Sequence, residues 1–222
     1  MQVHKNGPVF KPTEVVELFI GGAHVIASAI SDPLVADSWD SPSVLEEQLV
    51  SGLAGHLARG GVWAVADYLD AGTASGPVDF ESAGEYFASF ADSASPEAHR
   101  SIRERGAAVA SVGRDDLVQM LGERLGELEP IMRTLDPAQL VTVIAGSVMR
   151  LSDYLATRIV EQTVHLDDLA RSVGHEPWPV PAGARALTIS VGSEIARRRF
   201  GDTALIRALY RKGFAEPTLP AL

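Results

Sequence analysis

The sequence predicts an all-α protein built around a bundle of four main helices. Apolar residues recur at three- and four-residue steps over long stretches of the 222-residue chain, which is the helical period. Prolines and glycines divide these stretches into segments of helical length, and no series of alternating β-branched residues indicates a sheet. Hydrophobic residues make up 46% of the chain, which is enough to form a core without disulfides.

Seven segments are expected to be helical, and the longer ones form the bundle. They are, in order, residues 13–32, 45–69, 80–90, 96–128, 151–173, 184–200 and 203–213. Thr13 is the expected N-cap of the first helix, and Gly174 is the expected C′ residue of the fifth. Ser43 and Glu46 fit a capping box before the second helix.

Glycine and proline also predict where the helices are interrupted. Gly60 and Gly61 lie inside the second helix and favour a kink there, and Gly113 weakens the 96–128 helix. Residues 71–81, rich in Gly, Ser and Pro, predict a loop, and residues 1–12 an arm.

Charge and cysteine content exclude several classes of function. The chain has no cysteine, so disulfides, cysteine-based zinc sites and a cysteine nucleophile are ruled out. Its net charge of −10 repels nucleic acid and anionic lipid. We read the basic run Arg197-Arg198-Arg199 as a solvated helix end. With no apolar signal core at the N-terminus and apolar runs too short for a membrane span, we expect a soluble, cytoplasmic protein that binds neither nucleic acid nor membrane.

One pair of polar residues carries a chemical signal. Glu161 and His165 are four residues apart in a strongly helical stretch, so both side chains lie on one face and can reach one ion. The alternative is a surface pair that stabilises the helix by about 0.2–0.5 kcal/mol. His56 could be a third ligand or a half-buried histidine bonded to a neighbour. Two histidines and one carboxylate form a known ligand set for catalytic zinc and leave a fourth position open.

Two segments carry a resemblance to a known family. The first is Trp39-Asp40-Ser41-Pro42-Ser43 followed by Leu53-Ala54-Gly55-His56-Leu57, and the second is the run 154–165 (YLATRIVEQTVH) followed by Asp168-Leu169-Ala170. Over residues 13–175 the chain resembles the metal-binding domain of the mycothiol-dependent maleylpyruvate isomerases. These belong to the wider superfamily of DinB-like proteins.

The resemblance implies a fold, a site and a chemistry. The fold would be a DinB-like four-helix bundle over residues 13–175 with additional short helices, and residues 176–222 would be a helical C-terminal extension packed on it. His56 from the second helix and Glu161 and His165 from the fourth would bind zinc, with Ni2+ or Fe2+ as alternatives. Mycothiol or a similar small thiol would be the cofactor, and a small electrophile the substrate of a transferase or isomerase.

Two departures from the family pattern keep a second function open. The family's Gly-Trp-Ser/Thr-Val element is replaced here by Glu47-Gln48-Leu49-Val50. The isomerase's C-terminal domain supplies a catalytic arginine, whereas only residues 176–222 follow here and no arginine among them can be matched. The alternative function is therefore a non-enzymatic metal-binding or regulatory helical module.

Four further residues are candidate supporting groups. Arg158 is the candidate catalytic and cofactor-binding residue, because a guanidinium can hold an anionic thiol or carboxylate, although it could instead brace nearby carboxylates. Trp63 is the candidate wall of the cofactor pocket, with a packing role as the alternative. Asp168 could orient an imidazole, but anchoring a neighbouring helix or loop is the preferred interpretation. His24 is interpreted as a core histidine. A homodimer is expected only because symmetric pairs are common.

Overall fold

A computed structural model describes residues 10–91 and 95–212 of the chain. Most of the expected N-terminal arm lies outside the described residues. The described part is an all-α fold, as expected. Its helices are α1 (Pro12–Ser31), α2 (Pro33–Asp37), α3 (Val50–Ala58), α4 (Ala64–Asp70), α5 (Ala83–Ala91), α6 (Pro96–Ala110), α7 (Arg114–Met132), α8 (Leu151–Val173), α9 (Ala182–Phe200) and α10 (Asp202–Tyr210).

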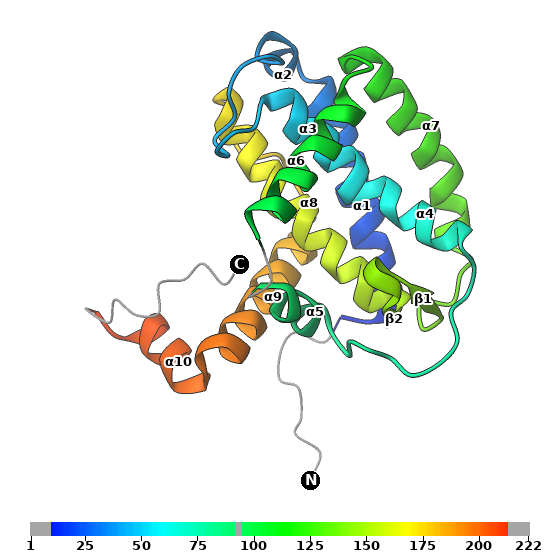
Figure 1. Cartoon of the computed structure of the whole chain (residues 1–222), viewed down its shortest axis with the longest axis vertical. Coiled ribbons are helices and arrows are strands. Elements are labelled where there is room, and N and C mark those ends of the chain that lie inside the picture. The colour runs from blue at the N-terminus through cyan, green and yellow to red at the C-terminus, as the bar shows by residue number, and fades with distance from the viewer. Residues whose placement is uncertain (1–9, 92–94, 213–222) are drawn as a thin grey trace.

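The bundle core lies between α1, α3, α7 and α8. α1 packs against both α8 and α7, while α3 packs against α8 on one side and α6 on the other (Figure 1). Large side chains from all four of these helices, among them Phe19, Leu53, Leu117 and Leu155, are fully buried. Each such side chain stabilises the fold by about 1.5–3 kcal/mol relative to an exposed position. The arrangement fixes α3 and α8 against each other.

The second expected helix begins later than predicted and changes its pitch midway. Residues 45–49 form a turn, closed by an isolated bridge between Pro42 and Leu49, and α3 starts only at Val50. The capping box of Ser43 and Glu46 is therefore wrong. The helix continues from α3 into α4 through a π-helical segment, Arg59–Trp63, which contains the two glycines expected to kink it.

The long helix expected over residues 96–128 is two helices. Gly113 adopts a φ of +94°, a conformation open to glycine but costly for other residues, and the chain turns there. α6 then packs on α3 while α7 packs on α1. The stretch expected to form one long helix therefore forms two, and each packs on a different helix of the bundle.

A small antiparallel sheet precedes α8 and was not predicted. β1 (Leu140–Thr142) pairs with β2 (Val148–Arg150), with Val141 opposite Met149, and a short 3-10 helix, Ile144–Gly146, lies in the turn between them. Three residues per strand are too few to show an alternating pattern. α8 starts directly after β2, so the sheet fixes where α8 begins.

α9 and α10 follow the bundle at the end of the molecule away from α2 (Figure 1). α9 packs on α5, α8 and α1, and α10 contacts α9. The basic run Arg197-Arg198-Arg199 lies exposed in the last turn of α9, as interpreted from the sequence. The division into a bundle over residues 13–175 and an extension over 176–222 stays a prediction.

Of the described helices, α1 alone is long and apolar enough to cross a membrane by length and composition, contrary to the expectation that every apolar run is too short. Half of its most apolar window is buried inside the structure. Core helices and signal sequences meet the same criterion, so the finding is weak support for a membrane span.

Candidate metal centre

α8 supplies the two residues whose spacing first indicated a site. It runs unbroken for 23 residues and ends at Gly174, which adopts the left-handed conformation expected of a C′ glycine. Within it, Glu161 and His165 lie one turn apart, with 3.5 Å between Glu161 Oε2 and His165 Nε2. The α-helical geometry alone brings this carboxylate and this imidazole together.

His56 completes the group from α3, 105 residues away along the chain. Its Nε2 lies 3.2 Å from Glu161 Oε2, and its ring meets that of His165 edge to face at 4.8 Å between centroids. One ligand atom from each of the three residues lies within 4.8 Å of the others. Ligand atoms bound at about 2 Å to a tetrahedral zinc lie about 3.3 Å apart, so the group could hold a divalent metal ion.

The three side chains are partly open to solvent. Between 18% and 23% of each side chain is exposed. A partly exposed group of three ligands leaves room for a fourth, exchangeable one, as in catalytic rather than closed structural zinc sites.

Glycines let the backbone of α6 approach His56. A Cβ at Gly106 would lie 3.2 Å from the Cβ of His56 and 2.6 Å from the carbonyl oxygen of Gly52. Only a residue without a side chain fits this contact unchanged. Gly106 therefore helps to fix the position of His56 along α3.

The electrostatics of the group favour a carboxylate anion. Burial alone would raise the pKa of Glu161, but hydrogen bonds with His165 and His56, and the nearby charge of Arg158, hold the pKa well below its usual value. Burial would lower the pKa of His165, but hydrogen bonds with Asp168 and Glu161 raise it to about 9. In the absence of metal, a proton on His165 takes the role of a cation beside Glu161.

Asp168 lies where it can orient His165. Its Oδ2 is 3.0 Å from His165 Nδ1, which leaves Nε2 of the same ring directed at Glu161. A carboxylate on the far nitrogen fixes the tautomer and orientation of a metal-binding imidazole. This geometry fits the orienting role rather than the anchoring role favoured from the sequence.

Arg158 lies one turn before Glu161 and is buried. Its Nη1 donates to the Gly60 carbonyl at 3.0 Å, its Nε donates to the Thr157 hydroxyl at 3.0 Å, and its guanidinium lies over the Tyr154 ring. Among the described residues, no carboxylate lies within ion-pair distance of it. A buried cation without an anion is unusual, since buried charges are normally paired.

The two remaining sequence expectations have mixed outcomes. Trp63 lies in the π-helical segment, partly buried against the core, and its indole nitrogen is buried without a hydrogen-bond partner. Its role as the wall of a cofactor pocket stays a prediction. His24 is not a core histidine: over half of its side chain is exposed and Nε2 lies 2.8 Å from Glu129.

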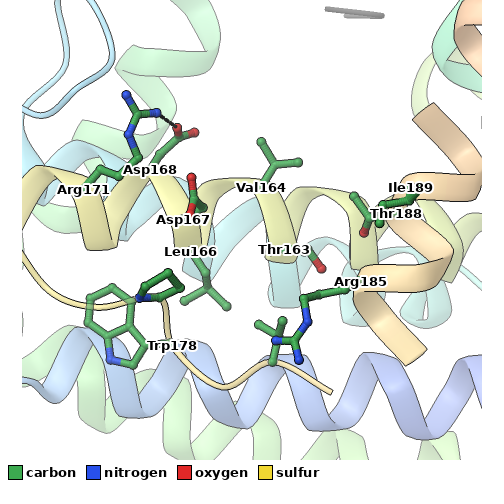
Figure 2. Close-up of a pocket in the computed structure, with 12 residues that line it drawn as sticks. Thr163, Val164, Leu166, Asp167, Asp168, Arg171, Trp178, Arg185, Thr188 and Ile189 are labelled. Carbon is green, nitrogen blue, oxygen red and sulfur yellow. Dashed lines mark ion pairs between the residues drawn. The ribbon is translucent and has the colours of Figure 1, made fainter. Parts of the chain in front are cut away.

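A surface hollow of about 510 Å³ lies on another face of α8. Figure 2 shows Trp178 and Arg185 facing it from the segment after α8 and from α9, and the Asp168–Arg171 ion pair at its edge. None of the three candidate ligands lines this hollow. Asp168 joins the two, because it lines the hollow and also contacts His165.

Sequence reasoning missed Gln162, which is 1% exposed. Its Nε2 donates to the Gly61 carbonyl of the π-helical segment at 2.8 Å. The sequence held one usable signal, since Gln162 lies four residues after Arg158 on a helix with an apolar face. A glutamine on such a face is expected to be buried, and a buried amide usually has a defined hydrogen-bond partner.

A helical bundle carrying a two-histidine, one-carboxylate group defines a class of helical proteins suited to binding a divalent metal. Residues 23–170 match the family model described as the mycothiol maleylpyruvate isomerase N-terminal domain. The chain belongs to this family, as the sequence resemblance implied. Comparison with curated proteins and with solved structures found no match.

Proposed function

We propose that the protein is a metal-dependent transferase or isomerase that acts on a small electrophile with the help of a small thiol such as mycothiol. The observation that carries this proposal is the convergence of His56, Glu161 and His165 on a common point, partly open to solvent. Zinc is the proposed ion, with Ni2+ or Fe2+ as alternatives, since these ligands suit all three.

The proposed chemistry needs an open position on the metal. A bound divalent ion lowers the pKa of a coordinated thiol and holds it as a nucleophilic thiolate. Asp168 would keep Nε2 of His165 directed at the ion, and Glu161 would supply the negative ligand charge. The thiolate sulfur would add to an electrophilic carbon of the substrate while the π bond at that carbon breaks, and the released electron pair would take a proton from solvent at the neighbouring atom. In an isomerisation the same carbon–sulfur bond would break again and return the thiolate.

Arg158 is the proposed catalytic and cofactor-binding residue. Its guanidinium is buried near Glu161 and has no carboxylate partner among the described residues. A carboxylate or other anionic group of the thiol or of the electrophile would supply the missing charge. Trp63, from the helix that carries His56, is proposed as a wall of the same pocket. We also propose a cytoplasmic location, and a homodimer only as the commonest assembly.

Metal analysis of protein purified without a histidine tag tests the proposal. We expect about one zinc ion per chain in the native protein, and its loss in His56→Ala and His165→Ala. His24→Ala, at an exposed histidine outside the group, is the matched control and should keep the metal. A native protein without metal, or full metal content in both variants, would contradict the proposal.

A thiol-transfer assay then separates an enzyme from a metal-binding module. Mycothiol and other small thiols would be combined with a panel of carboxylate-bearing electrophiles. Metal-dependent turnover supports the enzyme, whereas stoichiometric metal without turnover supports a non-enzymatic metal-binding or regulatory module.

A further inference from the structure

The helix that carries His56 changes its hydrogen-bonding pattern immediately after that residue. α3 ends at Ala58, and the π-helical segment Arg59–Trp63 follows without a break. In a π-helix the backbone bonds run from i to i+5, and this pattern is rare and found mostly as single turns near functional sites. The His56 imidazole lies beside the segment, because a Cβ added at Gly60 would lie 3.4 Å from its Cε1, in van der Waals contact.

Two successive carbonyls of the π-helical segment are bound by side chains of α8. Gly60 accepts from Arg158 Nη1 at 3.0 Å, and Gly61 accepts from Gln162 Nε2 at 2.8 Å. The two donors are one helical turn apart and flank Glu161 along α8. The helix that offers two of the candidate ligands thereby also holds the turn that follows the third.

Gln162 is fixed from its other side by α1. Its amide nitrogen lies 3.4 Å from the Phe19 carbonyl. A Cβ at Gly22 would collide with its amide oxygen, so the absence of a side chain at Gly22 makes room for the glutamine. That oxygen is buried and has no partner among the described residues, so the amide is held by its donor side alone. A buried polar atom without a hydrogen-bond partner lowers the stability of the fold. Gln162 carries this cost while its amide nitrogen binds the Gly61 carbonyl.

We infer that Gln162 is a positioning residue for the metal centre, holding the π-helical turn so that His56 meets Glu161 and His165. This inference rests on the proposed metal site. The side-chain amide of Gln162 acts on the metal centre through the backbone. It binds the Gly61 carbonyl and so holds the π-helical turn, and the imidazole of His56 lies beside that turn at Gly60. Loss of its hydrogen bond would let the turn relax toward an α-helix and rotate His56 away from the shared point.

The test uses the Co2+-loaded full chain without thiol or substrate. The visible absorption of Co2+ reports ligand geometry, and competition against a chelator gives the metal affinity. Gln162→Met keeps the volume and removes the donor. We expect metal affinity to fall about tenfold to a hundredfold, the range for residues that orient ligands, and the Co2+ band to change in position or intensity.

Two neighbouring glycines of α1 give a matched pair in case Gln162→Met does not fold. Gly22→Ala crowds the amide of Gln162, while Gly21→Ala crowds Pro181 instead, where its Cβ would lie 2.9 Å from Cγ. Both place one methyl group in a tight contact of the same helix. Gly22→Ala should change the Co2+ spectrum in the direction of Gln162→Met, and Gly21→Ala should leave it as in the native protein.

The outcomes separate this inference from the proposed function. Native spectra and affinity in both Gln162→Met and Gly22→Ala, even with lowered melting temperatures, would show a structural role only and overturn the inference. Equal spectral changes in Gly21→Ala and Gly22→Ala would do the same. A native protein that binds no Co2+ would overturn the metal site together with the inference.

Discussion

The Oδ2 atom of Asp168 lies 3.0 Å from Nδ1 of His165, on the side of the ring opposite Glu161. Asp168 also lies at the edge of the hollow beside α8, where Arg171 is 3.8 Å from its other oxygen. One carboxylate thus joins the candidate metal centre to the surface. Removal of the Asp168 carboxylate should lower the affinity for metal more than it lowers the stability of the fold.

Asp168→Ala is expected to weaken zinc binding about tenfold to a hundredfold, because the His165 ring loses the partner that fixes its orientation. Asp168→Asn keeps an acceptor and should weaken binding less. Competition titration with a chelator measures both. Asp167→Ala, at the exposed neighbouring position, is the control and should bind zinc as the native protein does. Native affinity in Asp168→Ala would contradict an orienting role.

Metal binding should release a proton at neutral pH. The pKa of His165 in the metal-free protein is raised to about 9, so its imidazole is protonated at pH 7, and a metal ion needs the neutral form. We expect about one proton released per ion at pH 7. The apparent affinity should rise about tenfold per pH unit until the pH passes the pKa of His165, and then level off.

Calorimetry in two buffers of different ionisation enthalpy measures this proton directly. Asp168→Asn replaces the charged acceptor beside His165 with a neutral one, which lowers the pKa of His165, so the number of protons released at pH 8 should fall. Binding heats that do not depend on the buffer would show that His165 is already neutral. The same pKa shift makes the stability of the metal-free fold depend on pH. Protonated His165 stabilises this fold fully below pH 6.5, the pKa of the imidazole in the unfolded chain, and the contribution is lost as the pH rises through about 9.

Two glycines should respond to alanine with opposite signs. Gly174 has a φ of +68° at the end of α8, where an alanine costs about 1 kcal/mol of folding free energy. Gly122 lies exposed in the middle of α7, and a Cβ added there would meet no atom within 4 Å, so alanine should stabilise the fold by about 0.5–1 kcal/mol. Urea unfolding of Gly174→Ala and Gly122→Ala measures both. Two changes of equal sign would contradict the backbone assignments.

Local signals allowed some elements to be predicted to the residue. α8 ends at Val173, as expected, because Gly174 is a stop signal that needs no long-range contact. The start of α3 was placed too early, since the turn over residues 45–49 depends on a distant partner. There the Val44 amide donates to the Ser172 hydroxyl of α8 at 3.0 Å. Nothing in the local sequence records that contact.

The residues of the candidate site likewise differ in whether the local sequence predicts them. Glu161 and His165 follow from helical spacing, but His56 lies 105 residues from Glu161, so only the family resemblance placed it beside them. Gln162 was missed because its role depends on the π-helical segment. Periodicity marked Gly60 and Gly61 as an interruption, without showing that their carbonyls would face α8.

Arg158 offers the sharpest separation between binding a ligand and supporting the fold. Arg158→Lys keeps a positive charge but loses the planar donor set, and Arg158→Met keeps the length of the side chain without charge. If the guanidinium pairs with an anionic group of the thiol or the electrophile, KM for that reactant should rise about tenfold or more in Arg158→Met. The rise should be smaller in Arg158→Lys.

The metal content of both variants has to be measured beside the kinetics, because Arg158 also donates to Gly60. Equal zinc affinity with a raised KM for an anionic reactant, and an unchanged KM for its neutral ester or amide, supports an anion-binding role. A loss of zinc that accounts for the whole loss of activity would reduce Arg158 to a brace of the π-helical turn. A KM that rises equally for the anionic and the neutral reactant would also exclude charge pairing, since only the charged form can pair with a guanidinium.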